Sequence, residues 1–72
     1  MKKTKKIKII LNGKSRSLRN TTSVYDLMRS LKISPDKVAI ELNKEIINKK
    51  KIKSLYLKNK DNIEIVHFIG GG

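Results

Sequence analysis

One stretch with helical spacing, set between several stretches with strand spacing, is the feature that most limits the fold of this sequence. Between residues 24 and 31, apolar side chains recur three or four positions apart, as on one face of a helix. These residues are Val24, Leu27, Met28 and Leu31. Before and after them, apolar residues recur at every second position, the period of a half-buried strand. This order predicts an α+β domain in which one helix, with Met28 in the core, covers one face of a sheet.

The first strand-like stretch leads into a tight turn. Apolar residues alternate from Ile7 to Leu11, and Asn12-Gly13 follows. Asn-Gly is favoured in two-residue hairpin turns because both positions need a positive φ. We therefore expect a hairpin whose second strand runs from Ser15 to Arg19, with Leu18 directed inward.

The helix is predicted from Val24 to Lys32. Ser23 before it and Asp26 three positions later form a weak capping box, since the partner of the serine is usually Glu or Gln. We expect Ser34-Pro35-Asp36 to stop the helix, because the residue before a proline is driven out of helical geometry.

The second half of the chain is predicted to complete the sheet. Alternation from Val38 to Leu42 predicts a strand, Asn43-Lys44 a turn, and Glu45 to Asn48 a very short strand. One helical turn that covers the core is expected next, around three apolar residues at helical spacing. The three residues are Ile52, Leu55 and Tyr56. The last strand is expected at Ile63 to Ile69.

This order of elements resembles the ubiquitin-like β-grasp fold. We expect a mixed sheet of four to five strands, one main helix packed across one face, and the last strand in the centre beside the first. The domain is placed at residues 7–69, after a basic N-terminal tail of residues 1–6 and before a flexible glycine tail of residues 70–72.

Composition narrows the classes of function. With 72 residues, 38% of them hydrophobic, the chain can build one thin core, which favours a carrier or binding module over an enzyme. The absence of cysteine excludes disulfides, thiolate metal sites and cysteine nucleophiles, and His67 alone cannot form a metal site. No apolar run approaches the roughly 20 residues of a membrane span, so we expect no membrane partner.

The net charge of +12 admits three explanations. Nucleic acid and an acidic protein are two of them. The third is codon bias toward Lys, Ile and Asn, which we favour because the positive residues are spread along the chain. We likewise interpret the run Lys49-Lys50-Lys51 as a solvated loop, with phosphate binding as the alternative. Tyr25 and Tyr56 are too few and scattered to stack bases, so we expect no nucleic-acid partner.

Three of the four glycines, Gly70, Gly71 and Gly72, are the last three residues. A terminal glycine run adds nothing to a core, but it makes a thin chain that can thread a narrow tunnel. Adenylation of the unhindered Gly72 carboxylate would give a mixed anhydride, from which AMP leaves when a sulfur or nitrogen nucleophile attacks. A frayed end or an engineered glycine scar is the alternative explanation.

Three segments resemble the ThiS family, the sulfur carriers of thiamine biosynthesis. They are residues 62–72 (NIEIVHFIGGG), residues 38–43 (VAIELN) and residues 11–14 (LNGK), and the resemblance spans about Ile7 to Gly72. Family members often have glycine where this chain has Lys44, and many have it where this chain has Lys60. We expect altered turn geometry at these two positions.

The resemblance implies a role as a cosubstrate and not as an enzyme. An E1-like activating enzyme would use ATP and magnesium to adenylate Gly72, and a cysteine desulfurase would supply persulfide sulfur to make a thiocarboxylate. Thiazole synthase would then take that sulfur. The chain would bind no cofactor, be a monomer when free, and reside in a bacterial cytoplasm or a plastid stroma.

Other functions stay open at this point. Sulfur carriers for molybdopterin or tRNA thiolation share the same end chemistry, and a ubiquitin-like protein tag is a further possibility. A small basic RNA-binding protein is the alternative from another class.

The last strand predicts a surface for partners. If Ile63 and Ile65 face the helix, then Glu64, Val66 and Phe68 face the uncovered side of the sheet. Exposed apolar groups there would mark a partner site, so these three residues are candidate partner contacts. Packing of Val66 and Phe68 on neighbouring strands, for example on Ile10, is the alternative.

Three ring side chains are assigned structural roles. His67 shares the side of Ile63 and Ile65, near the thinning end of the core, and is expected to be half-buried. Tyr25 and Tyr56 are interpreted as amphipathic packing residues.

Overall fold

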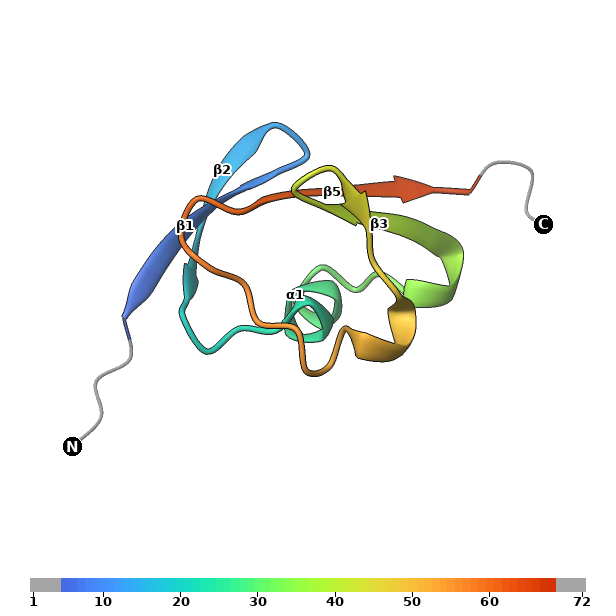
Figure 1. The fold of residues 1–72 in the computed structure, drawn as a ribbon, viewed down its shortest axis with the longest axis horizontal. Coiled ribbons are helices and arrows are strands. Elements are labelled where there is room, and N and C mark those ends of the chain that lie inside the picture. The colour runs from blue at the N-terminus through green and yellow to red at the C-terminus, as the bar shows by residue number, and fades with distance from the viewer. Residues whose placement is uncertain (1–4, 69–72) are drawn as a thin grey trace.

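The computed structural model describes residues 5–68. In this part of the chain the strands form a single sheet in the order β2-β1-β5-β3-β4. The strands are β1 (Lys6–Leu11), β2 (Lys14–Arg19), β3 (Val38–Leu42), β4 (Glu45–Ile46) and β5 (Asn62–His67); the helices are α1 (Val24–Ser30) and the short 3-10 helices η1 (Pro35–Lys37) and η2 (Lys49–Lys51). The central β5 runs parallel to β1 and antiparallel to β3, which confirms the predicted mixed sheet (Figure 1).

The core lies between the sheet and α1, which covers one face of the sheet (Figure 1). Ile9, Ile40 and Ile63 reach into it from β1, β3 and β5, and each is fully buried. Leu27 and Met28 meet them from α1 and are also fully buried, so the apolar stripe of the helix was predicted correctly. Each such side chain contributes roughly 1.5–3 kcal/mol of burial free energy, so even a thin core can hold this fold.

The start of α1 is fixed by a complete capping box. Ser23 Oγ accepts a hydrogen bond from the Asp26 backbone N–H at 3.0 Å, and Asp26 Oδ2 accepts one from the Ser23 N–H at 3.1 Å. The shorter Asp therefore fills the place of the usual Glu, because both orphan donors at the helix start find acceptors. Ser23 is only 3% exposed, so these donors would otherwise be buried without partners.

The end of α1 comes at Ser30, two residues before the predicted end. Lys32 adopts a φ of 58°, its N–H donates to the Arg29 carbonyl at 3.0 Å, and the Ile33 N–H donates to the Met28 carbonyl at 3.0 Å. This is a Schellman motif, so backbone hydrogen bonds end the helix upstream of Pro35, and the proline is not what stops it.

No helix among residues 5–68 is long and apolar enough to cross a membrane.

Both two-residue hairpin turns have the left-handed geometry that hairpins favour. Asn12 and Gly13 have φ of 48° and 84°, and Asn43 and Lys44 have φ of 53° and 73°. Lys60, in the last turn, has a φ of 75°. The expected change of turn geometry at Lys44 and Lys60 was wrong, because both lysines adopt the left-handed φ that glycine adopts freely. A non-glycine residue does so at a cost of roughly 1–2 kcal/mol.

The segment before β5 differs most from the prediction. The short helix η2 lies at Lys49–Lys51, and the chain after Ser54 is extended. In an extended chain neighbouring side chains point to opposite sides, so Tyr56 is 53% exposed while Leu57 is buried. The predicted contact of Tyr56 with the core was therefore wrong, and Leu57 is buried in the core instead. The strands also differ slightly in length: β1 starts at Lys6, β4 ends at Ile46 and β5 ends at His67.

Candidate functional site

The strand that precedes the glycines is held in place by an asparagine from each hairpin turn. Asn12 Oδ1 accepts a hydrogen bond from the Ile65 N–H at 2.8 Å, and Asn12 Nδ2 donates to the Ile65 carbonyl at 3.4 Å. On the other side of β5, Asn43 Oδ1 accepts from the Asn62 N–H at 2.9 Å. The Asn43 N–H in turn donates to the Asn62 carbonyl at 2.7 Å. These bonds fix β5 laterally at two separate points.

A carboxylate reinforces the second of these points. Asp61 Oδ1 accepts a hydrogen bond from Asn43 Nδ2 at 3.0 Å, and Asp61 Oδ2 accepts one from the Lys58 N–H at 2.8 Å. The turn that leads into β5 is thus tied to the turn between β3 and β4. Hydrogen bonds to an ionised carboxylate are stronger than those between neutral groups, so the start of β5 is well defined.

The side chains of β5 alternate as the sequence predicted. Ile63 and Ile65 are buried against the core, whereas Glu64 is exposed, Val66 is 56% exposed and Phe68 is 57% exposed. Val66 and Phe68 are therefore not buried by Ile10 or by other neighbours. Two apolar side chains, Val66 and Phe68, are thus exposed to solvent shortly before residues 69–72.

Other exposed apolar side chains share the uncovered face of the sheet. Val66 pairs with Ala39 of β3, and Ile46 of β4 pairs with Glu41, which pairs with Glu64. Register places Ile46 and Val66 on one face, and Ile10 lies on it from β1 beside Asn62. Phe68 follows Val66 by two positions, just after the end of β5. We call this set the open-face patch. It consists of Ile10, Ile46, Val66 and Phe68, four of the five exposed large hydrophobic residues of the described chain.

The last described residue, Phe68, has two contacts that fix it. Its N–H donates a hydrogen bond to the Lys37 carbonyl, at the end of η1, at 3.1 Å. Lys49 Nζ of η2 lies 4.9 Å from the centroid of its ring. A cation–π contact at an exposed site contributes about 0.5–1 kcal/mol, so Phe68 keeps a defined place between η1 and η2.

His67 was predicted to be half-buried, and this prediction was wrong. Its side is that of Ile63 and Ile65, but it is exposed. Figure 1 shows β5 extending to the right beyond α1, so this helix does not cover the C-terminal end of the strand. Among residues 5–68, no group of three or more acidic or histidine side chains could hold a metal ion. Gly70, Gly71 and Gly72 lie outside the described residues, as does the rest of segment 69–72.

The fold and the site together define a class of protein. A five-stranded mixed sheet with one covering helix, whose central strand leads to a glycine run, is the arrangement of a ubiquitin-like β-grasp protein. The model of the ThiS family matches residues 9–72. The chain therefore belongs to the ThiS family.

Individual relatives agree with this membership. The sulfur carrier protein ThiS of Bacillus subtilis is 43% identical over 63 residues, which cover 86% of this chain and 96% of that protein. A thiazole synthase of Magnetococcus marinus is 39% identical over 66 residues, or 92% of this chain, but the chain spans only 20% of that protein. The crystal structure of a thiamine biosynthesis protein (ThiS) from Geobacter metallireducens superposes with a TM-score of 0.79 at 28% identity, covering 92% of this chain and 100% of that one.

Sequence reasoning missed the two asparagine side chains that hold β5. It assigned Asn12 and Asn43 to turns only, on the grounds of their backbone preference. A signal was present, because both turns begin with the same pair, Leu-Asn, at residues 11–12 and 42–43. Where an asparagine begins a hairpin turn beside a third strand, its amide is free to bond that strand, and the repeated pair could have indicated this.

Proposed function

We propose that this chain is a sulfur carrier of thiamine biosynthesis and that the Gly72 carboxyl group carries the sulfur. The observation that supports this most directly is the match to the ThiS family, which extends through residue 72. The anchored central strand β5 supports it further, because this strand would present residues 69–72 from a fixed point, Phe68.

The proposed chemistry takes place at the Gly72 carboxylate. A carboxylate oxygen attacks the α-phosphorus of ATP within an E1-like enzyme that supplies magnesium, and pyrophosphate leaves. The terminal sulfur of a cysteine persulfide, made by a desulfurase, then attacks the carbonyl carbon and displaces AMP. A thiol cleaves the resulting S–S bond and leaves a thiocarboxylate on Gly72. The chain acts as a cosubstrate in each step and holds no cofactor of its own.

The proposed acceptor of the sulfur is thiazole synthase. In the Magnetococcus thiazole synthase, a segment similar to this chain occupies about a fifth of the polypeptide, so carrier-like and synthase parts occur there in one protein. A carrier for molybdopterin or tRNA thiolation would have the same end chemistry but a different acceptor. We propose that the chain works in a bacterial cytoplasm or a plastid stroma.

The proposed contact surface for these enzymes is the open-face patch. Val66 and Phe68 are exposed beside the glycine segment, and Glu64 lies on the same strand and the same face. Exposed apolar groups gathered on one face are typical of protein contacts, and a central aromatic is often the strongest single contributor. A partner that covers this face would therefore meet the glycine segment next to Phe68.

The test is a measurement of intact mass. The chain is incubated with ATP, magnesium, the activating enzyme and a cysteine desulfurase with cysteine, and its mass should rise by the difference between sulfur and oxygen. A variant that lacks Gly72 should show no such gain. Sulfur loss on adding thiazole synthase identifies the acceptor. Salt-sensitive retention of RNA without any mass gain would instead support an RNA-binding protein.

A further inference from the structure

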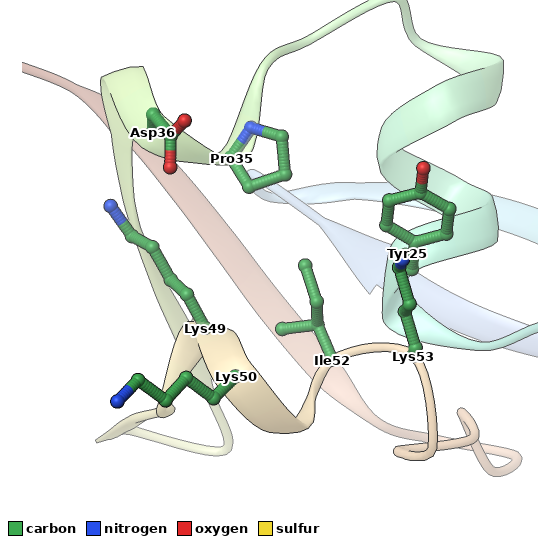
Figure 2. Close-up of a pocket in the computed structure, with 7 residues that line it drawn as sticks. All are labelled: Tyr25, Pro35, Asp36, Lys49, Lys50, Ile52 and Lys53. Atoms are coloured by element: carbon green, nitrogen blue, oxygen red, sulfur yellow. The ribbon is translucent and has the colours of Figure 1, made fainter.

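A second feature adjoins the open-face patch at Phe68, whose ring contacts Lys49. It is a pocket of about 400 Å³ between α1, η1 and η2. Figure 2 shows Ile52, Pro35 and Tyr25 around its interior and lysines at its margin. The lining residues are Tyr25, Pro35, Asp36, Lys49, Lys50, Ile52 and Lys53. The pocket therefore combines an apolar interior with a predominantly cationic rim.

The local backbone explains which lysines reach the pocket. Asn48 caps η2, because its Oδ1 accepts a hydrogen bond from the Lys50 N–H at 2.8 Å. A 3-10 helix has three residues per turn, so consecutive side chains point about 120° apart. Lys49 and Lys50 accordingly line the pocket, together with Lys53, whereas Lys51 does not. The lysine run is thus a capped turn in which Lys49 and Lys50 lie at the pocket and Lys51 points elsewhere.

Two of the pocket lysines already contact an aromatic ring, Lys49 that of Phe68 and Lys53 that of Tyr25. Lys49 is half-buried, its Nζ lies over the Phe68 ring, and Figure 2 shows its side chain directed toward Asp36. Lys50 and Lys53 are exposed, and their charges outnumber the single carboxylate of the rim. The pocket therefore presents a net positive charge to an incoming group.

The aromatic rings near the pocket are not arranged to stack on a base. Lys53 Nζ lies 4.9 Å from the centroid of the Tyr25 ring, and Arg29 Cζ lies 6.0 Å from it. Cations thus occupy the positions over Tyr25 where a nucleobase would have to lie. The charges and the apolar interior suit a carboxylate beside an apolar side chain better than they suit a nucleic acid.

The pocket adjoins the point from which the glycine segment departs. Phe68 is bonded to Lys37 of η1 and contacts Lys49 of η2, and these two helices form the pocket walls. A protein that receives residues 69–72 must therefore come close to this pocket as well as to the open-face patch.

We propose that the pocket is a docking site for an acidic segment of the enzyme that adenylates Gly72. Acidic side chains of that segment bind at the rim by Lys50 and by Lys53, which lie on opposite sides of Ile52 (Figure 2), and an apolar side chain between them packs against Pro35 and Ile52. This inference rests on the proposed function. It adds a second contact, beside the Phe68 end of the open-face patch, and it gives part of the +12 charge a specific use.

The test uses two double variants, each with two lysines changed to glutamate. Their Kd for the activating enzyme of the same genome is measured by calorimetric titration. Lys50→Glu/Lys53→Glu changes the pocket, and Lys51→Glu/Lys58→Glu makes the same charge change at exposed lysines that do not line it. We expect the pocket variant to raise Kd about tenfold and the control about twofold or less, with the difference shrinking in high salt. In spectra of the ¹⁵N-labelled chain, addition of the enzyme should shift the amides of Ile52 and Lys53 but not that of Gly13.

Several outcomes would overturn the proposal. Equal losses in the two variants would mean that the enzyme senses only overall charge. Unchanged affinity of the pocket variant, or shifts at Ile52 and Lys53 with an RNA oligonucleotide but not with the enzyme, would exclude this partner. If the wild-type chain gains sulfur normally in these cases, only the pocket assignment fails. If the wild-type chain neither binds the enzyme nor gains sulfur, the proposed function fails with it.

Discussion

Asn12 Oδ1 accepts a hydrogen bond from the backbone N–H of Ile65 at 2.8 Å, across 53 positions of the sequence. The bond joins the first hairpin turn to the central strand, one residue before Val66. Asn12 thus has two separate roles: its backbone turns the hairpin at a φ of 48°, and its side chain anchors β5.

These two roles can be separated by mutation. Asn12→Gly keeps the left-handed turn but removes the acceptor for the part-buried Ile65 N–H, so we expect a loss of about 1–3 kcal/mol in the free energy of unfolding. Asn12→Asp retains an acceptor oxygen at the same place and should lose less. Urea denaturation of both variants checks this, and a glycine variant as stable as the wild type would show that the anchor contributes nothing.

The two left-handed lysines offer a stabilising change. Lys44→Gly and Lys60→Gly relieve the steric cost of φ near 73° and 75°, partly offset by the greater freedom of glycine in the unfolded chain. We expect each to raise the free energy of unfolding by about 0.5–1 kcal/mol. Lys14→Gly, in β2, is the control and should instead lower it by about 0.5–1 kcal/mol. Thermal unfolding checks this order. If Lys44→Gly or Lys60→Gly were no more stable than Lys14→Gly, the assigned turn geometry would be contradicted.

The capping box predicts a specific loss at the start of α1. Ser23→Ala removes the Oγ acceptor of the Asp26 N–H, so unfolding should become easier by about 1 kcal/mol. Ser34 precedes η1 but makes no capping hydrogen bond with its side chain. Ser34→Ala should therefore stay within about 0.5 kcal/mol of the wild type in the same denaturation experiment. Equal effects at both serines would argue against the cap.

The open-face patch predicts an effect on activation rather than on stability. Phe68→Ala should slow adenylation about tenfold if the ring anchors the partner, while circular dichroism stays that of the folded domain. Tyr56→Ala is the matched control, because that ring is similarly exposed, 53% against 57%, but its backbone pairs with Ser23 at the start of α1. Its adenylation rate should not change. A wild-type rate for folded Phe68→Ala would remove Phe68 from the proposed contact.

The prediction of elements succeeded where local rules act alone. The Asn12-Gly13 hairpin, the apolar stripe of α1 and the alternation of β5 all follow from side-chain periodicity and from the φ preferences of single residues. The prediction failed where the conformation of the neighbouring backbone decides where an element ends or which way a side chain points. The helix ended early because the Schellman motif at Lys32 closed it, and Tyr56 points outward because the segment that carries it is extended.

The sequence by itself determined the order of strands and helix and the buried positions Ile63 and Ile65, because each depends on a repeat of two or of three to four residues. Repeat alone left open whether Val66 and Phe68 are exposed or pack on Ile10, and the tertiary structure decided that they are exposed. Only the tertiary structure decided which distant groups meet. The bond from Asn12 to Ile65, the stack of Lys49 on Phe68 and the lysine-rimmed pocket join residues far apart in the chain. No periodicity encodes such contacts, since they depend on how the turns and short helices are brought together around the core.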